Sequence, residues 1–112
     1  MSRTAIKYME HKGSLTGGDA RICRVAYSKS GRSLYYRGSR FEATKSGYKY
    51  NYIEVETGER YWITGPKKGG GDRLYNERVP IQIDEDVREE YWLDIRGEES
   101  QILETVITPP NA

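Results

Sequence analysis

The sequence is poor in three residue types that often mark a functional site: it has one cysteine, one histidine and four prolines in 112 residues. The single cysteine, Cys23, cannot form an intrachain disulfide, so nothing points to an oxidising compartment. One histidine and one cysteine are too few for the common zinc sites, and the acids lack EF-hand spacing. We therefore expect neither a metal nor a cofactor.

Long hydrophobic runs are also missing. No stretch approaches the roughly 18 apolar residues of a membrane-spanning helix, and no signal-peptide core follows the N-terminus. We therefore expect a cytoplasmic protein without a membrane partner. Hydrophobic residues make up 36% of the chain and include ten tyrosines. Tyrosine buries its ring and keeps its hydroxyl in contact with water, which suits the thin core of one small domain.

Net charge is close to zero, at +1, which excludes a strong global attraction to nucleic acid or membranes. The charges are nevertheless unevenly distributed along the chain. Between Arg21 and Lys49 there are eight Lys and Arg residues and one acid, Glu42, whereas eight acids and two Arg lie between Asp84 and Glu99. Two interpretations stay open: the charges balance one another on the folded surface, or they form a basic binding face and an acidic end.

The sequence is rich in signals for β-hairpins. Residues 27–36 read as two strands joined by a tight turn, in which Gly31 supplies a left-handed backbone conformation. A second hairpin is predicted from residues 48–53 and 60–64. The strands of the first hairpin are predicted at residues 22–27 and 33–37, and further short strands at residues 5–9, 40–43 and 79–83. Because Pro80 cannot donate a backbone hydrogen bond, we expect this last strand at a sheet edge.

One segment, residues 86–97, has helical periodicity. Its apolar residues Val87, Tyr91 and Ile95 are four positions apart and therefore share one helix face. Acids crowd the first turn, where the helix dipole favours them. We expect Tyr91 or Trp92 to pack against the sheet, because this apolar stripe needs a surface to cover.

These elements predict a mainly β protein: a small bent β-barrel, SH3-like or OB-like, of five to seven short antiparallel strands, with one short helix near residues 85–96. We expect one β-rich domain over residues 1–97. The C-terminal tail, residues 98–112, is expected either to dock as an edge strand or to fray.

A glycine-rich segment, residues 65–73, is the most unusual local feature. Glycines let backbone N–H groups converge on an anion, and nearby cations add charge. The candidate anion-binding residues are Lys67, Lys68, Gly69, Gly70 and Arg73. The P-loop pattern is absent, and the alternative is a hairpin connection whose lysines keep it soluble.

Aromatic residues alternate with cations in the first half of the chain. This combination is typical of surfaces that bind single-stranded nucleic acid, because bases stack on the rings and the cations contact phosphates. The candidate residues are Arg32, Tyr35, Arg37, Arg40, Lys49 and Tyr50. The alternative is that the rings form the core and the cross-strand pairs of the barrel.

No residue set predicts catalysis. The acids at 84–86 are better explained as helix caps, and Glu54, Glu56 and Glu59, near a turn, are expected to be solvated. The leading hypothesis is a non-catalytic binding module that contacts an anionic partner, with single-stranded nucleic acid as the most specific guess. The alternative is a protein-interaction module that uses the aromatic sheet face or the acidic helix, and a third option is a small-molecule pocket lined by Tyr and Trp.

The positions of five cations discriminate among these hypotheses. If they share one face, the anion-binding hypothesis gains support; if they pair with the acids of residues 84–99, it loses support. The five are Arg24, Arg32, Arg37, Arg40 and Lys67.

Three stretches of the chain carry a resemblance: SKSGRSLYY at 28–36, ETGERYWITGPKK at 56–68 and IDEDVREEYW at 83–92. Together they resemble a group of small bacterial proteins of unassigned function. The resemblance spans most of the chain up to Gly97 and implies a bacterial, cytosolic, stand-alone protein. It implies no activity.

Overall fold

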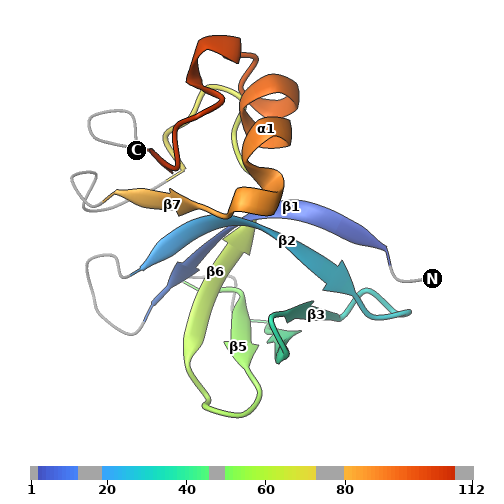
Figure 1. The fold of residues 1–112 in the computed structure, drawn as a ribbon. Helices are drawn as coiled ribbons and strands as arrows, with labels where there is room; N and C mark the ends of the chain where they lie inside the picture. The colour runs from blue at the N-terminus through green and yellow to red at the C-terminus, as the bar shows by residue number, and fades with distance from the viewer. Residues whose placement is uncertain (1–2, 13–18, 46–49, 73–79, 108–112) are drawn as a thin grey trace.

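Six strands form a closed antiparallel barrel in the computed structural model, which describes residues 3–12, 19–45, 50–72 and 80–107 (Figure 1). Each strand pairs with the next along the chain, and the last pairs with the first. The strands are β1 (Thr4–His11), β2 (Ala20–Tyr27), β3 (Ser33–Tyr36), β4 (Ser39–Ala43), β5 (Tyr52–Glu54) and β6 (Arg60–Thr64). The small β-barrel predicted from the hairpin signals is therefore confirmed.

A second layer covers one side of the barrel (Figure 1). It contains two short strands that extend the sheet beyond β2, and a helical segment. The elements are β7 (Ile81–Ile83), the 3-10 turn η1 (Glu85–Val87), the helix α1 (Arg88–Glu90), the π-helical turn η2 (Tyr91–Ile95), the 3-10 turn η3 (Glu99–Gln101) and β8 (Val106–Ile107). None of the helices in the described residues is long and apolar enough to cross a membrane.

The position of β7 differs from the prediction. Pro80 precedes β7, which pairs in parallel with β2 on one side and antiparallel with β8 on the other. The edge is therefore β8, which comes from the C-terminal segment, and Ile107 in that strand is buried. A proline directly before a strand removes no ladder hydrogen bond, so it does not force that strand to the edge.

Strands β1 and β2 bury both of their faces, because side chains alternate across a strand. One face points into the barrel and the other lies under the second layer. The interior cluster contains Met9, Cys23, Val25, Leu34, Phe41 and Ile63. The cluster between the layers contains Tyr8, Ala20, Ile22, Ile81, Ile83, Val87, Tyr91, Trp92 and Ile107.

The helical segment is wider at its end than a regular α-helix. The backbone N–H of Arg96 donates to the carbonyl of Tyr91, five residues earlier, as in a π-helix. Tyr91 and Trp92 are both buried, with their rings edge to face at 5.0 Å. The prediction that this segment packs an aromatic residue against the sheet is therefore confirmed.

Other predicted elements are shifted by a few residues. The strand predicted at residues 48–53 is observed as β5, Tyr52–Glu54, so Tyr50 precedes the strand. Residues 46–49, which hold Lys49, lie outside the described residues, as does Arg73. The described part of the C-terminal segment, up to Ile107, forms η3 and β8.

Truncation of Trp92 tests the packing of the second layer. Trp92 is 4% exposed and its indole N–H donates to the carbonyl of Glu104 at 3.0 Å. Trp92→Ala should lower the free energy of unfolding by about 3–5 kcal/mol in a urea titration, because it removes a large core side chain. Leu93→Ala, at a position 38% exposed on the same turn, is the control and should cost less than about 1 kcal/mol. Equal losses in the two variants would contradict this packing.

The reactivity of the Cys23 thiol tests whether the barrel interior is closed to solvent. Its side chain is fully buried, and burial raises the pKa of its thiol to about 12, with a further rise from the nearby Asp84 carboxylate. Because only the thiolate reacts, a thiol reagent should label the native protein at least about tenfold more slowly than the protein in urea. Equal rates in the two conditions would show that the barrel interior is open.

Candidate binding site at the barrel mouth

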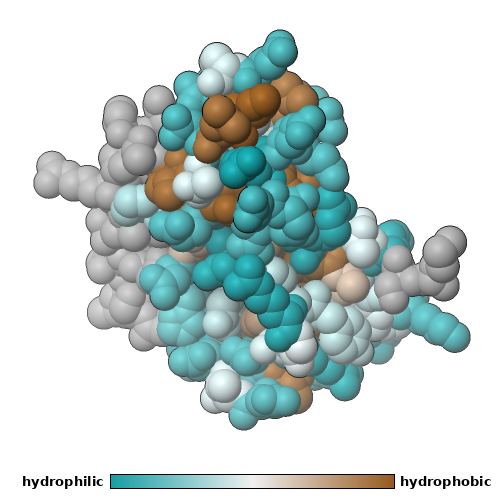
Figure 2. Space-filling model, viewed as in Figure 1, coloured by the Kyte–Doolittle hydropathy of each residue, from teal (hydrophilic) through white to brown (hydrophobic). Residues whose placement is uncertain are grey.

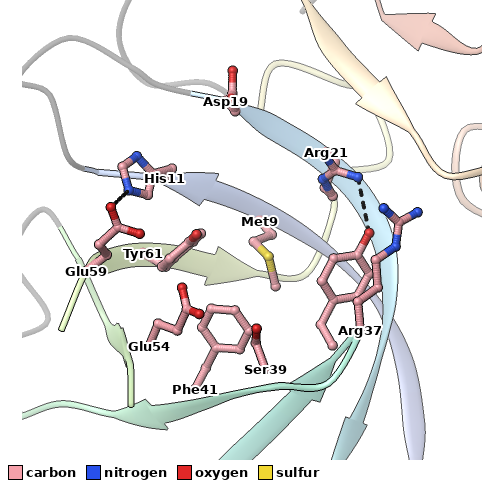
Figure 3. Close-up of a pocket in the computed structure, with 11 residues that line it drawn as sticks. Met9, His11, Asp19, Arg21, Arg37, Ser39, Phe41, Glu54, Glu59 and Tyr61 are labelled. Atoms are coloured by element: carbon pink, nitrogen blue, oxygen red, sulfur yellow. Dashed lines mark hydrogen bonds and ion pairs between the residues drawn. The ribbon is translucent and has the colours of Figure 1, made fainter. Parts of the chain in front are cut away.

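One end of the barrel interior opens into a pocket of about 400 Å³ (Figure 3). Met9 and Phe41, both buried, contribute to its apolar part. The remaining lining is mostly polar or charged and comes from strands β1 to β6 and the turns beside them. The pocket is therefore the polar continuation of the barrel core.

Strand alternation explains why charged residues line the inside of a barrel. A polar lining residue lies two positions from a buried interior residue of its own strand, so both point inward. The pairs are His11 with Met9, Arg21 with Cys23, Tyr36 with Leu34, and Tyr61 with Ile63. The core ends where these positions change from apolar to polar, and there the pocket begins.

Two arginines and a tyrosine meet the carboxylate of Asp84 at one side of the mouth. Asp84 is 8% exposed and directly precedes η1. Arg21 donates to Asp84 Oδ1 at 3.1 Å and to the Tyr36 hydroxyl at 3.2 Å, and Tyr36 donates to Asp84 Oδ2. Arg37 Nη2 lies 3.5 Å from the same Oδ2. Two guanidinium groups thus share one carboxylate, which leaves this side with a net positive charge.

Arg37 has an unusual backbone conformation. It is the only non-glycine residue with positive φ in the described part of the chain, at 47°, and Gly38 follows at 82°. Because Tyr36 pairs with Ser39, these two residues form the two-residue turn of the β3–β4 hairpin, with the left-handed φ values of a type I′ turn. Asn, Asp or Gly is favoured at the first position, so arginine is a costly choice there. Residues held in such sparsely populated conformations cluster at functional sites.

Glu54 and Glu59 lie with His11 and Tyr61 on the other side of the pocket, and Asp19 lines the pocket from the start of β2, apart from these four residues (Figure 3). Glu59 Oε1 lies 3.3 Å from His11 Nε2. The backbone N–H of Glu54 donates to the carbonyl of Glu59 at 2.9 Å, which brings these two acids together across the β5–β6 hairpin. The backbone N–H of His11 donates to the carbonyl of Asp19 at 2.9 Å. This side of the pocket is therefore acidic.

Both tyrosines at the mouth keep their protons at physiological pH. Burial raises the pKa of Tyr36 to about 12, and its hydrogen bond to Asp84 adds to the shift. Burial also raises the pKa of Tyr61, and the carboxylates of Glu54, Glu59 and Asp19 raise it further. Each phenol is therefore a neutral hydroxyl, and that of Tyr36 already donates its hydrogen bond to the Asp84 carboxylate.

Sequence reasoning misses most of the pocket. Of the residues that line it, only Arg37 is a candidate from the sequence, while Glu54 and Glu59 are expected there to be solvated. The other lining residues are far apart in the sequence and are brought together by barrel closure. One local signal can be read from the sequence: an arginine before glycine in a tight hairpin.

The glycine-rich segment lies elsewhere, beside the second layer (Figure 1). The Arg96 guanidinium lies so close to Gly70 that a Cβ there would meet its Nη1 at 2.9 Å. Lys67 makes two hydrogen bonds within the segment: its backbone N–H donates to the Asp72 carboxylate at 2.8 Å, and the side-chain Nζ of Lys67 donates to the carbonyl of Gly71 at 3.3 Å. Lys68 and Gly69 are exposed. This geometry gives the segment a structural role, and the predicted anion contact stays a prediction.

Four of the candidate nucleic-acid residues, Arg32, Tyr35, Arg37 and Arg40, belong to the β3–β4 hairpin or the turns beside it, and Lys49 lies outside the described residues. Tyr35, 41% exposed, is paired with Arg40 across β3 and β4, and Arg32 lies in the preceding turn. Arg37 lies at the pocket, and the ring of Tyr50 is covered by the Arg60 guanidinium at 5.0 Å.

The cations that discriminate among the hypotheses are largely paired. Arg24 binds Glu90 of α1 at 2.5 Å, Arg37 binds Asp84, and Arg40 binds Glu42 at 2.7 Å. Two of these partners belong to the acidic segment 84–99. This pairing reduces the support for a continuous basic face.

The large exposed apolar residues in the described part of the chain are Tyr35, Val55, Leu93 and Leu103, of which Leu93 and Leu103 belong to the helical layer. Figure 2 shows a mostly hydrophilic face, with hydrophobic residues gathered near the helical layer. Single exposed apolar residues are common on soluble surfaces and do not define an interface. Among residues 3–12, 19–45, 50–72 and 80–107, no three His, Cys, Asp or Glu side chains are grouped to hold a metal ion.

Comparison of the chain with protein-family models, with curated proteins and with solved structures found no match. Function is therefore inferred from the geometry of the barrel mouth.

Substitution of Arg37 tests whether this arginine is needed for the stability of the β3–β4 turn. Arg37→Asn should leave the free energy of unfolding unchanged or raise it by up to about 1 kcal/mol, because asparagine tolerates the left-handed conformation. The lost ion pair costs little, since the Arg37 side chain is 66% exposed. Gly38→Ala, where nothing lies within 4 Å of an added Cβ, should cost about 1–2 kcal/mol from backbone strain alone. A large loss in Arg37→Asn would show that the arginine is needed for folding.

Proposed function

We propose that this protein is a small binding module whose binding site is the barrel mouth, and that it holds an anionic group of a small ligand against Arg21 and Arg37. The observation that carries the proposal is the arginine at the strained turn position. Arg37 is held in a left-handed conformation at the rim of a pocket of about 400 Å³, beside a second arginine. Its cost to the turn is explained if the guanidinium has a ligand to bind.

The charge balance at this side of the mouth supports an anionic ligand. Arg21 and Arg37 carry two positive charges, and the Asp84 carboxylate neutralises one of them. A guanidinium has five N–H donors, so each arginine keeps donors beyond its contacts with Asp84 and Tyr36. Carboxylates and phosphates match this donor geometry. Asp84 and Tyr36 hold the Arg21 guanidinium in place, so little ordering of Arg21 is needed when a ligand binds.

The size and polarity of the pocket support a small polar ligand. A volume of about 400 Å³ is near the lower end of the range for small-molecule sites. Because few apolar side chains line it, binding depends on charge and hydrogen bonds, and we expect dissociation constants of about 0.1–10 mM for simple anions.

Thermal unfolding with small anions tests the proposal. Sodium pentanoate and glycerol 2-phosphate at about 20 mM, each against sodium chloride of equal ionic strength, should raise the melting temperature by several degrees. This corresponds to about 2 kcal/mol for a dissociation constant near 1 mM. Arg37→Asn should lose more than half of this shift.

A matched control variant tests whether the anion binds at the barrel mouth or at the glycine-rich segment. Lys68→Gln makes the same change of charge on the glycine-rich segment and should keep the full shift. If Lys68→Gln loses the shift and Arg37→Asn keeps it, the glycine-rich segment binds the anion and the proposal is wrong. A short oligothymidylate is the third probe: stabilisation by it that Tyr35→Ala abolishes and Arg37→Asn retains would identify a nucleic-acid surface instead.

A further inference from the structure

The barrel mouth has two walls of opposite charge (Figure 3). On the basic wall, Arg21 and Arg37 share one carboxylate, as described above. The acidic wall carries Glu54 and Glu59 beside the basic residue His11, and Asp19 lines the pocket apart from them. A simple anion neutralises only the basic wall. A ligand that complements the whole site therefore also carries a positively charged group for the acidic wall.

The acidic wall carries more carboxylates than ion-pair partners in the described part of the chain. Glu59 is paired with His11 at 3.3 Å. Neither Glu54 nor Asp19 has an ion-pair partner within the described ranges of the chain, although both line the same pocket. Burial is the main cause of the raised pKa of Tyr61, to which all three acids add and from which Arg21 subtracts, so the phenol lies within the field of both walls. Unpaired carboxylates beside a pocket attract a cation.

Aromatic rings adjoin this wall. Tyr61 contacts His11 edge to face at 5.1 Å and Phe41 at 4.9 Å, and all three rings line the pocket. Ring faces attract ammonium groups, and more strongly where water is partly excluded. Acids and rings together are suited to an alkylammonium group rather than to a hydrated metal ion, which prefers several oxygen ligands at fixed geometry.

We infer that the natural ligand of the barrel mouth is a small zwitterion: a molecule of amino-acid size that carries an ammonium group and a carboxylate. This inference rests on the proposed function, because Arg21 and Arg37 hold the carboxylate. It adds that Glu54 receives the ammonium group, in the negative field of Asp19 and with the ring of Tyr61 beside it. Both walls are then neutralised by one molecule.

A matched set of probes tests the ligand class. The ω-amino acids from glycine to 6-aminohexanoate should be titrated by ligand-observed NMR, each beside the carboxylate and the amine of equal chain length. At the chain length that spans the pocket, the zwitterion should bind at least about fivefold more tightly than either singly charged partner, because it gains charge-assisted hydrogen bonds at both walls.

Three variants assign the two ends of the ligand. Glu54→Gln should lower the affinity of the zwitterion to about that of the carboxylate and leave carboxylate binding intact. Arg37→Asn should weaken the zwitterion and the carboxylate alike. Glu56→Gln, at an exposed acid outside the pocket lining, makes the same charge change and should alter neither. The melting temperature of each variant shows that it is folded.

The outcomes separate the two proposals. If carboxylates bind and depend on Arg37, but no zwitterion binds more tightly or Glu54→Gln has no effect, the zwitterion inference is wrong and the anion site stands. Amines that bind as tightly as zwitterions would also overturn the inference, since the site would then need no carboxylate. If no probe binds, both proposals fail.

Discussion

The carboxylate of Asp84 is the group on which the arrangement of the barrel mouth depends. It belongs to the second layer, yet its partners Arg21, Tyr36 and Arg37 belong to the barrel. A carboxylate that is 8% exposed needs counter-charge and hydrogen bonds, and these three residues supply them. Its backbone N–H also donates to the carbonyl of Ile22 at 3.0 Å. The same interactions therefore join the two layers and hold Arg21 at the rim, with the more exposed Arg37 beside it.

The remainder of the mouth follows from barrel closure. Six short strands supply inward-facing positions, and those nearest one end are polar. Arg21 and Arg37 come from β2 and the β3–β4 turn, whereas Glu54 and Glu59 come from the β5–β6 hairpin, so the sheet holds these basic and acidic groups on different sides of the pocket. The ligand that we propose carries both charges and therefore complements both walls of this one small cavity.

The sequence predicts the local structure well and the site poorly. The alternation at residues 27–36 is enough to predict a hairpin, but the register that closes β6 onto β1 depends on contacts between distant residues. His11 and Glu54 come to line one pocket only through this closure. The glycine-rich segment has the same composition whether its glycines bind an anion or make room for a neighbour. Arg96, which packs on Gly70, lies beyond β7 and α1 in the chain, so only the folded structure reveals this contact.

The most direct test of the binding site is a map of where a ligand contacts the protein. A two-dimensional NMR titration of isotope-labelled protein with the tightest ω-amino acid reports on each backbone amide and on the arginine side chains. We predict that the largest shifts fall on Arg21, Arg37, Glu54 and Tyr61, around the barrel mouth. Shifts centred on residues 67–70 of the glycine-rich segment, or on the outer face of the β3–β4 hairpin, would contradict this assignment.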